Sequence, residues 1–250
     1  MSGHSKWSTI KRKKAAEDAK RGQVFTKLAK EIAIAAREGA DPEMNYKLRL
    51  VIDKAKAANM PKDNLERAVR RGAGLEKGAE LEEISYEGYG PHGVALIVQV
   101  VTDNRNRAVA SIRRGFTKLG GSLGETGCVA WQFEIKGYLT LAPDGLDQDE
   151  VFDVAVEWGA DDVVFGDDLI EIFTSPEDFR TVREALEGRG ITLESAEITL
   201  MPKTTVSLNE KQTLQNMNLI AALEDLEDVQ QVYSNLDISD ELMTTFEEQD

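Results

Sequence analysis

The sequence has few residues of the types that hold metals and form disulfides. Its 250 residues include one cysteine, Cys128, and two histidines, His4 and His92. A single cysteine excludes an intramolecular disulfide and a thiolate metal cluster, and it is typical of a reducing compartment. The two histidines lie far apart in sequence and have no cysteine partners, so they form no zinc motif. We therefore predict a protein with no metal and no cofactor.

Long apolar runs are also missing. No stretch approaches the ~18 consecutive apolar residues that a transmembrane helix needs. The N-terminus is rich in lysine and lacks the apolar segment of a signal peptide. These two absences predict a cytoplasmic protein that makes no contact with a membrane.

Two catalytic motifs are matched in letters but not in context. Gly88, Gly90 and Gly93 spell G-x-G-x-x-G, but the segment contains Pro91 and runs into an apolar strand. A dinucleotide-binding loop must instead open a helix, whose N-terminus meets the pyrophosphate. Ser122 lies in a G-x-S-x-G match that follows a helix, and no histidine comes after it to complete a hydrolase triad. We predict that the protein is not an enzyme.

Charge is divided unevenly along the chain. Residues 1–75 carry 18 Lys and Arg against 9 Asp and Glu, whereas the whole chain has a formal net charge of −15. The first part is therefore +9 and the remainder −24. Because the summed field of a protein steers charged ligands, a polyanion would be drawn to the N-terminal end and repelled elsewhere. The pattern predicts a nucleic-acid partner for the basic part, with possible protein partners for the acidic domains.

The basic part has the periodicity of short helices. Apolar residues recur at helical spacing over 23–38 and 46–58, and a third helix is expected to begin at Pro61 and end at Gly72. Three such helices predict a small bundle. The preceding arm, residues 1–21, has little to bury, and Gly22 is expected to weaken a continuous helix across the junction.

Cations in the arm recur at an interval of seven residues, which would place them on one stripe of a helix. Trp7 has two interpretations: it stacks on a base or wedges against a nucleic-acid backbone, or it simply anchors the arm. The candidate nucleic-acid-binding residues in this part of the chain are Lys6, Trp7, Lys11, Arg12, Lys13, Lys14, Lys20, Arg21 and Lys27.

From residue 84 onward the pattern is mixed α and β. A strand is predicted over 94–102, a helix over 104–119 with Arg107 and Arg114 on its outer face, and an alternating strand over 129–135. Residues 138–200 follow the order βαββαβ, with Trp158 expected to face inward, and the tail, with a strand over 204–208, is expected to complete the sheet begun at residue 84.

The predicted fold is therefore α+β. An N-terminal three-helix bundle with a basic arm (1–75) is followed by two ferredoxin-like α/β sandwich domains. The first of these is formed by 76–133 plus 203–250, and the other, 134–202, is inserted in it.

Several short segments resemble those of the YebC/PmpR family and occur in that family's order. They are GHSKW at 3–7, AKRG at 19–22, YEGYGP at 86–91, DNRNR at 103–107 and LGGSLG at 119–124. The resemblance spans essentially the whole chain. It implies a three-domain cytoplasmic protein of a kind mostly described as a DNA-binding transcriptional regulator. Mitochondrial relatives activate translation, and bacterial ones are implicated in relieving stalled ribosomes.

The resemblance also implies site residues in the second domain: Asn104, Arg105, Asn106 and Arg107, beside which Arg114 shares the helix face. The alternative for 104–107 is a helix N-terminus with solvated side chains. Cys128 departs from the family pattern, which implies a small hydroxyl residue there. The function expected is DNA-binding transcriptional regulation. The alternative is a ribosome-associated translation factor that binds ribosomal RNA and relieves stalled or inefficient translation.

Overall fold

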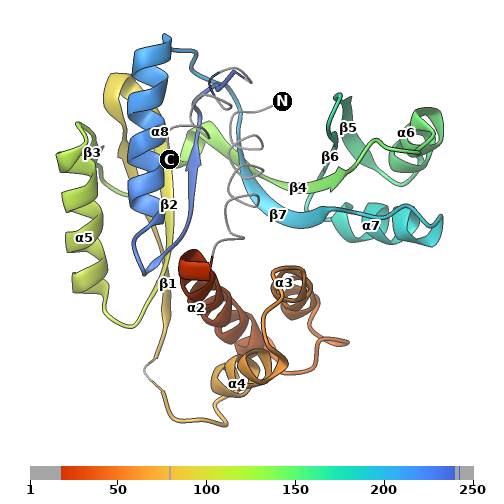
Figure 1. Ribbon diagram of the computed structural model, residues 1–250, viewed down its shortest axis with the longest axis horizontal. Coiled ribbons are helices and arrows are strands. Elements are labelled where there is room, and N and C mark those ends of the chain that lie inside the picture. The colour runs from red at the N-terminus through yellow and green to blue at the C-terminus, as the bar shows by residue number, and fades with distance from the viewer. Residues whose placement is uncertain (1–17, 79, 240–241, 243–250) are drawn as a thin grey trace. The chain divides into compact units, whose positions relative to one another are not determined.

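The computed structural model describes residues 18–78, 80–239 and 242, with side chains from residue 21 onward (Figure 1). The chain forms two compact units. One is Phe133–Met201, and the other contains the described residues before and after that segment. The α+β class is confirmed, because helices accompany two separate four-stranded sheets. Within the described residues no helix is long and apolar enough to cross a membrane.

Three helices form the bundle near the N-terminus. They are α2 (Asp18–Ala35), α3 (Tyr46–Ala57) and α4 (Lys62–Gly72), with a 3-10 turn at Ala36–Glu38. Leu28, Ile32 and Leu48 are buried at their centre. The Asn45 side chain caps α3 by accepting the Leu48 N–H at 3.0 Å. Helix α2 runs without a break through Gly22, where the sequence predicts a weakened helix.

The larger unit also contains a two-layer α/β sandwich. Strands β1 (Glu82–Tyr89), β2 (Ala95–Thr102), β3 (Ser122–Leu123) and β8 (Val229–Ser234) form an antiparallel sheet in the order β3-β1-β2-β8. Helices α5 (Arg105–Lys118) and α8 (Glu210–Glu224) lie side by side on one face (Figure 1). The first two strands form a hairpin, so the element order is ββαβαβ.

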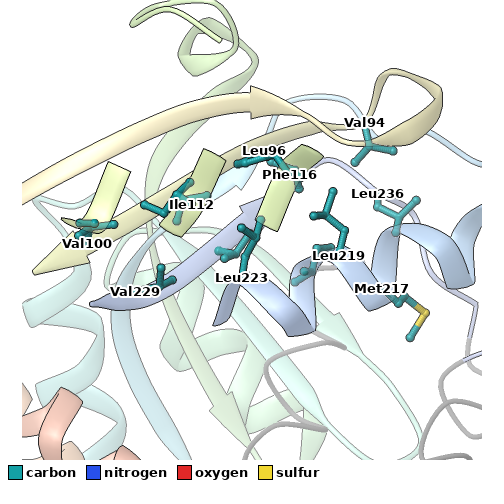
Figure 2. Close-up of a cluster of buried hydrophobic side chains, with 14 of the residues drawn as sticks. Val94, Leu96, Val100, Ile112, Phe116, Met217, Leu219, Leu223, Val229 and Leu236 are labelled. Carbon is teal, nitrogen blue, oxygen red and sulfur yellow. The ribbon is translucent and has the colours of Figure 1, made fainter. Parts of the chain in front are cut away.

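The core of this sandwich fills the space between the sheet and the two helices. Figure 2 shows Leu96 of β2, Ile112 and Phe116 of α5, and Leu219 and Leu223 of α8 converging there. The helices come close together because Gly115 has no side chain: a Cβ at this position would lie 2.9 Å from the Leu223 side chain. This packing fixes which face of α5 is directed outward.

The Phe133–Met201 unit has the strand order of a ferredoxin-like fold. Its elements are β4 (Phe133–Leu141), α6 (Gln148–Glu157), β5 (Ala160–Phe165), β6 (Ile170–Thr174), α7 (Phe179–Gly188) and β7 (Ser195–Pro202), and the sheet order is β5-β6-β4-β7. The Ser175 hydroxyl accepts the Asp178 N–H at 3.0 Å in the turn that precedes α7. Trp158 was predicted to face inward, but its side chain is about half exposed.

Two strand predictions are wrong. The segment 129–135 is not one strand, because Ala130–Gln132 forms a 3-10 turn and β4 starts only at Phe133. The predicted strand at 204–208 is reduced to an isolated bridge between Val206 and Leu236. The G-x-G-x-x-G match does not open a helix of useful length: Gly88 lies inside β1, and a single 3-10 turn, Pro91–Gly93, precedes β2.

Candidate nucleic-acid interface

Helix α5 is positioned by a cap at its start and an apolar stripe along its length. Asn104 accepts the backbone N–H of Arg107 at 3.0 Å, and its own N–H is donated to the Thr102 hydroxyl, also at 3.0 Å. Ala108, Ile112 and Phe116 are buried against the sandwich core. The Asn104 side chain therefore serves as a helix cap, which is the structural alternative considered for this segment.

The outer side of α5 is strongly basic. The helix contains Arg and Lys at five positions and no Asp or Glu. Arg113, Arg114 and Lys118 are exposed, with Ala110 and Thr117 between them in a shallow open depression. We call Arg113, Arg114 and Lys118 the α5 basic face. Among the described residues no carboxylate forms an ion pair with these three cations, so the α5 basic face is open to an anionic ligand.

Arg107 differs from its neighbours because it is held by carboxylates of the same chain. Its guanidinium donates to Asp228 at 3.0 and 3.1 Å and to Asp103 at 2.9 Å. The hydrogen bond and charge of Asp228 raise the pKa of Arg107. Arg107 was predicted to share an outer face with Arg114; about half of its side chain is exposed, and its guanidinium is also bound by Asp228.

Two lysines of α2 also donate hydrogen bonds to groups at the C-terminal end of α8 and just after it. Lys30 Nζ lies 3.0 Å from Asp228 Oδ1 and donates to the Glu227 carbonyl at 3.1 Å. Lys27 Nζ donates to the carbonyl of Glu224. Burial alone would raise the pKa of Asp228, but the hydrogen bonds and charges of Lys30 and Arg107 outweigh it and lower that pKa. Lys27, a predicted nucleic-acid ligand, is therefore engaged within the protein.

The structure describes only some of the remaining predicted nucleic-acid-binding residues. Arg105 and Arg21 are exposed, at the start of α5 and near the start of α2. Lys20 lies in α2, and its side chain is not described. Lys6, Trp7, Lys11, Arg12, Lys13 and Lys14 lie outside the described residues.

Sequence reasoning missed Arg113 and Lys118. The signal was present, because 114 and 118 are one helical turn apart and the whole helix lacks acidic residues.

In the described part of the chain, no group of three or more His, Cys, Asp and Glu residues is arranged to hold a metal ion. His92 instead lies near the side chains of Gln212 and Gln215.

Comparisons with known proteins cover nearly the whole chain. The family model described as the TACO1/YebC protein N-terminal domain matches residues 5–75, and that described as the TACO1/YebC second and third domain matches 81–236. A probable transcriptional regulatory protein of Trichlorobacter lovleyi is 55% identical over 240 residues, which cover 96% of this chain and 97% of the relative. One from Geobacter sulfurreducens is 54% identical over 244 residues, covering 97% and 98%.

A solved structure has the same fold. The crystal structure of a conserved hypothetical protein from Aquifex aeolicus matches with a TM-score of 0.81 and 45% sequence identity. The match covers 89% of this chain and 93% of that one.

Proposed function

The chain belongs to the TACO1/YebC family, and we propose from this that it is a non-enzymatic, nucleic-acid-binding regulator of gene expression, most directly a DNA-binding transcriptional regulator. Relatives that are more than half identical over almost the full length are named probable transcriptional regulatory proteins. Proteins this similar over this length share their fold, which supports a common type of ligand.

The α5 basic face is the observation that carries the proposal. In a protein of net charge −15, three exposed cations without ion-pair partners in the described structure are arranged along one helix. Solvated cations that are not balanced by carboxylates attract phosphates, and binding releases the counterions condensed on the nucleic acid. The basic N-terminal part, with a net charge of +9, supplies further phosphate contacts under this proposal.

Such contacts position a nucleic acid but do not read its sequence. Arginine and lysine bind phosphates in any sequence, and here the N-terminus of α5 is occupied by its own Asn104 cap. We therefore expect moderate, salt-dependent affinity, with selectivity that arises from nucleic-acid shape or from additional contacts rather than from a recognition helix.

A charge-matched comparison tests the role of the α5 basic face. We expect the triple variant Arg113→Gln, Arg114→Gln, Lys118→Gln to bind a fluorescein-labelled 20-bp duplex at least about tenfold more weakly at low salt. The slope of log affinity against log salt should become shallower by up to about 2.7, since each lost phosphate contact contributes about 0.9.

The control is Arg180→Gln, Arg183→Gln, Arg189→Gln. It removes the same charge from residues that are already paired with Glu184, Glu187 and Glu150. Equal effects of the two triple variants would contradict the α5 interface. Cross-linking in cells followed by sequencing tests the type of nucleic acid: recovery of ribosomal RNA without promoter enrichment would overturn the DNA-binding part of the proposal.

A further inference from the structure

A second feature of the larger unit is an exposed tryptophan that is held in place. The side chain of Trp131 is 68% exposed. Covering a large aromatic ring is favourable by roughly 25 cal/mol for each Å² of apolar surface removed from water. The indole is bonded to the backbone nearby, because its Nε1–H donates to the Cys128 carbonyl at 3.1 Å. An exposed indole ring that is hydrogen-bonded to the backbone nearby is suited to packing against a ligand.

The backbone around Trp131 is fixed by further hydrogen bonds. The Tyr89 hydroxyl donates to the same Cys128 carbonyl at 3.0 Å. Lys203 adds two more hydrogen bonds: its Nζ donates to the Trp131 carbonyl at 3.0 Å, and its backbone N–H donates to the carbonyl of Gln132. The tryptophan is therefore tied to β1 and to the segment after β7.

A buried carboxylate holds the preceding loop. Glu87 is 6% exposed and accepts the backbone N–H groups of Gly127, Val129 and Ala130 at 2.6, 2.8 and 2.8 Å. Burial would raise the pKa of Glu87, but these three donors outweigh it and lower the pKa, so the carboxylate stays charged. The loop is in this way organised before any ligand arrives, which reduces the entropic cost of binding.

The cation that is hydrogen-bonded to the Trp131 backbone indicates the chemistry of the ligand. Lys203 is exposed and retains two ammonium hydrogens beyond the one given to Trp131, and the described residues include no carboxylate that pairs with it. An exposed aromatic ring on a residue whose backbone carbonyl accepts from a lysine ammonium matches a nucleotide, whose base stacks on aromatic rings while its phosphate binds ammonium groups.

We propose that Trp131 and Lys203 form a binding site for an unpaired nucleotide, in which the indole stacks on the base and the Lys203 ammonium contacts a phosphate. This inference rests on the proposed nucleic-acid-binding function and refines it. Bases inside a duplex present no free face, so the site acts on single strands, loops or frayed ends.

The test compares two labelled oligonucleotides that carry the same number of phosphates: a dT decamer and an abasic decamer. We expect the full-length protein to bind the dT decamer about 5- to 160-fold more tightly, because one stacked base contributes about 1–3 kcal/mol. Trp131→Ala should abolish the preference, whereas Trp131→Phe should retain most of it. Trp158→Ala, which removes another partly exposed indole, should leave it unchanged.

Lys203→Ala should weaken binding to both decamers and make the salt dependence shallower by about 0.7, the contribution of one phosphate on a single strand. Equal binding of the two decamers by the wild-type protein, or a preference that survives in Trp131→Ala, would overturn the nucleotide site while leaving the α5 interface intact. Failure of the wild-type protein to bind any oligonucleotide would overturn both proposals.

Discussion

Arg107 holds Asp228 through both carboxylate oxygens, with Nη2 3.0 Å from Oδ1 and Nε 3.1 Å from Oδ2. The two residues are 121 positions apart in the sequence. Lys30 of α2 reaches the same carboxylate at 3.0 Å. One acidic side chain between α8 and β8 thus joins a helix of the bundle to a helix of the sandwich. Paired donors from a planar guanidinium make such a contact both strong and directional.

Replacement of this carboxylate should weaken the larger unit. Asp228→Asn removes the negative charge that Lys30 and Arg107 share, and we expect the free energy of unfolding to fall by about 1–3 kcal/mol. Urea denaturation measures the change. Asp225→Asn is the matched control, because Asp225 is an exposed residue near the same end of α8. Equal stability of the two variants would show that the Asp228 contacts contribute nothing.

The stability of the protein should fall in acid in part through Glu87. Its pKa is lowered below the ordinary 4.5 in the folded state, so its contribution is complete above that pH and is lost as the pH falls through the folded-state value. Glu87→Gln should lower stability at pH 7 by about 1–3 kcal/mol and flatten the acid limb of a plot of stability against pH. Glu125→Gln, an exposed neighbour, should do neither.

Two glycines of the bundle should respond to alanine in opposite directions. Gly22 lies inside α2 with open space around it, so Gly22→Ala should stabilise the protein by about 0.5–1 kcal/mol through better helix propensity. At Gly72 a Cβ would overlap the Ala33 carbonyl oxygen of α2, so Gly72→Ala should destabilise it. Thermal melts of the two variants give the comparison, and a shift in the same direction would contradict the packing of α4 on α2.

The Cys128 thiol should react slowly. Burial and the nearby charge of Glu87 raise the pKa of Cys128 above the ordinary 9.0, and only the thiolate is nucleophilic. At pH 8 we expect DTNB to modify the folded protein more slowly than the urea-unfolded chain, measured by absorbance. Equal rates would indicate an open, unperturbed thiol.

Local periodicity predicted most of the elements correctly. The stripes of Leu28 and Ile32 in α2, and of Ile112 and Phe116 in α5, are buried as expected because helical spacing alone places them on one face. The strand predicted from the alternation of Val129, Trp131 and Phe133 does not begin at Val129, for a reason that local periodicity cannot reveal. Glu87, more than forty positions away, takes the N–H groups of Val129 and Ala130 and turns the chain there.

The sequence by itself determined the separation of charge, the helices and strands with clear periodicity, and the resemblance that led to the family, because each of these depends on residues close together or on composition. The tertiary structure alone decided which cations remain free for a ligand. Asp228 engages Arg107 and Lys30 across 121 and 198 positions, while Arg113, Arg114 and Lys118 are left facing solvent. Ion pairing depends on distance in space, and only the folded chain brings these distant groups together.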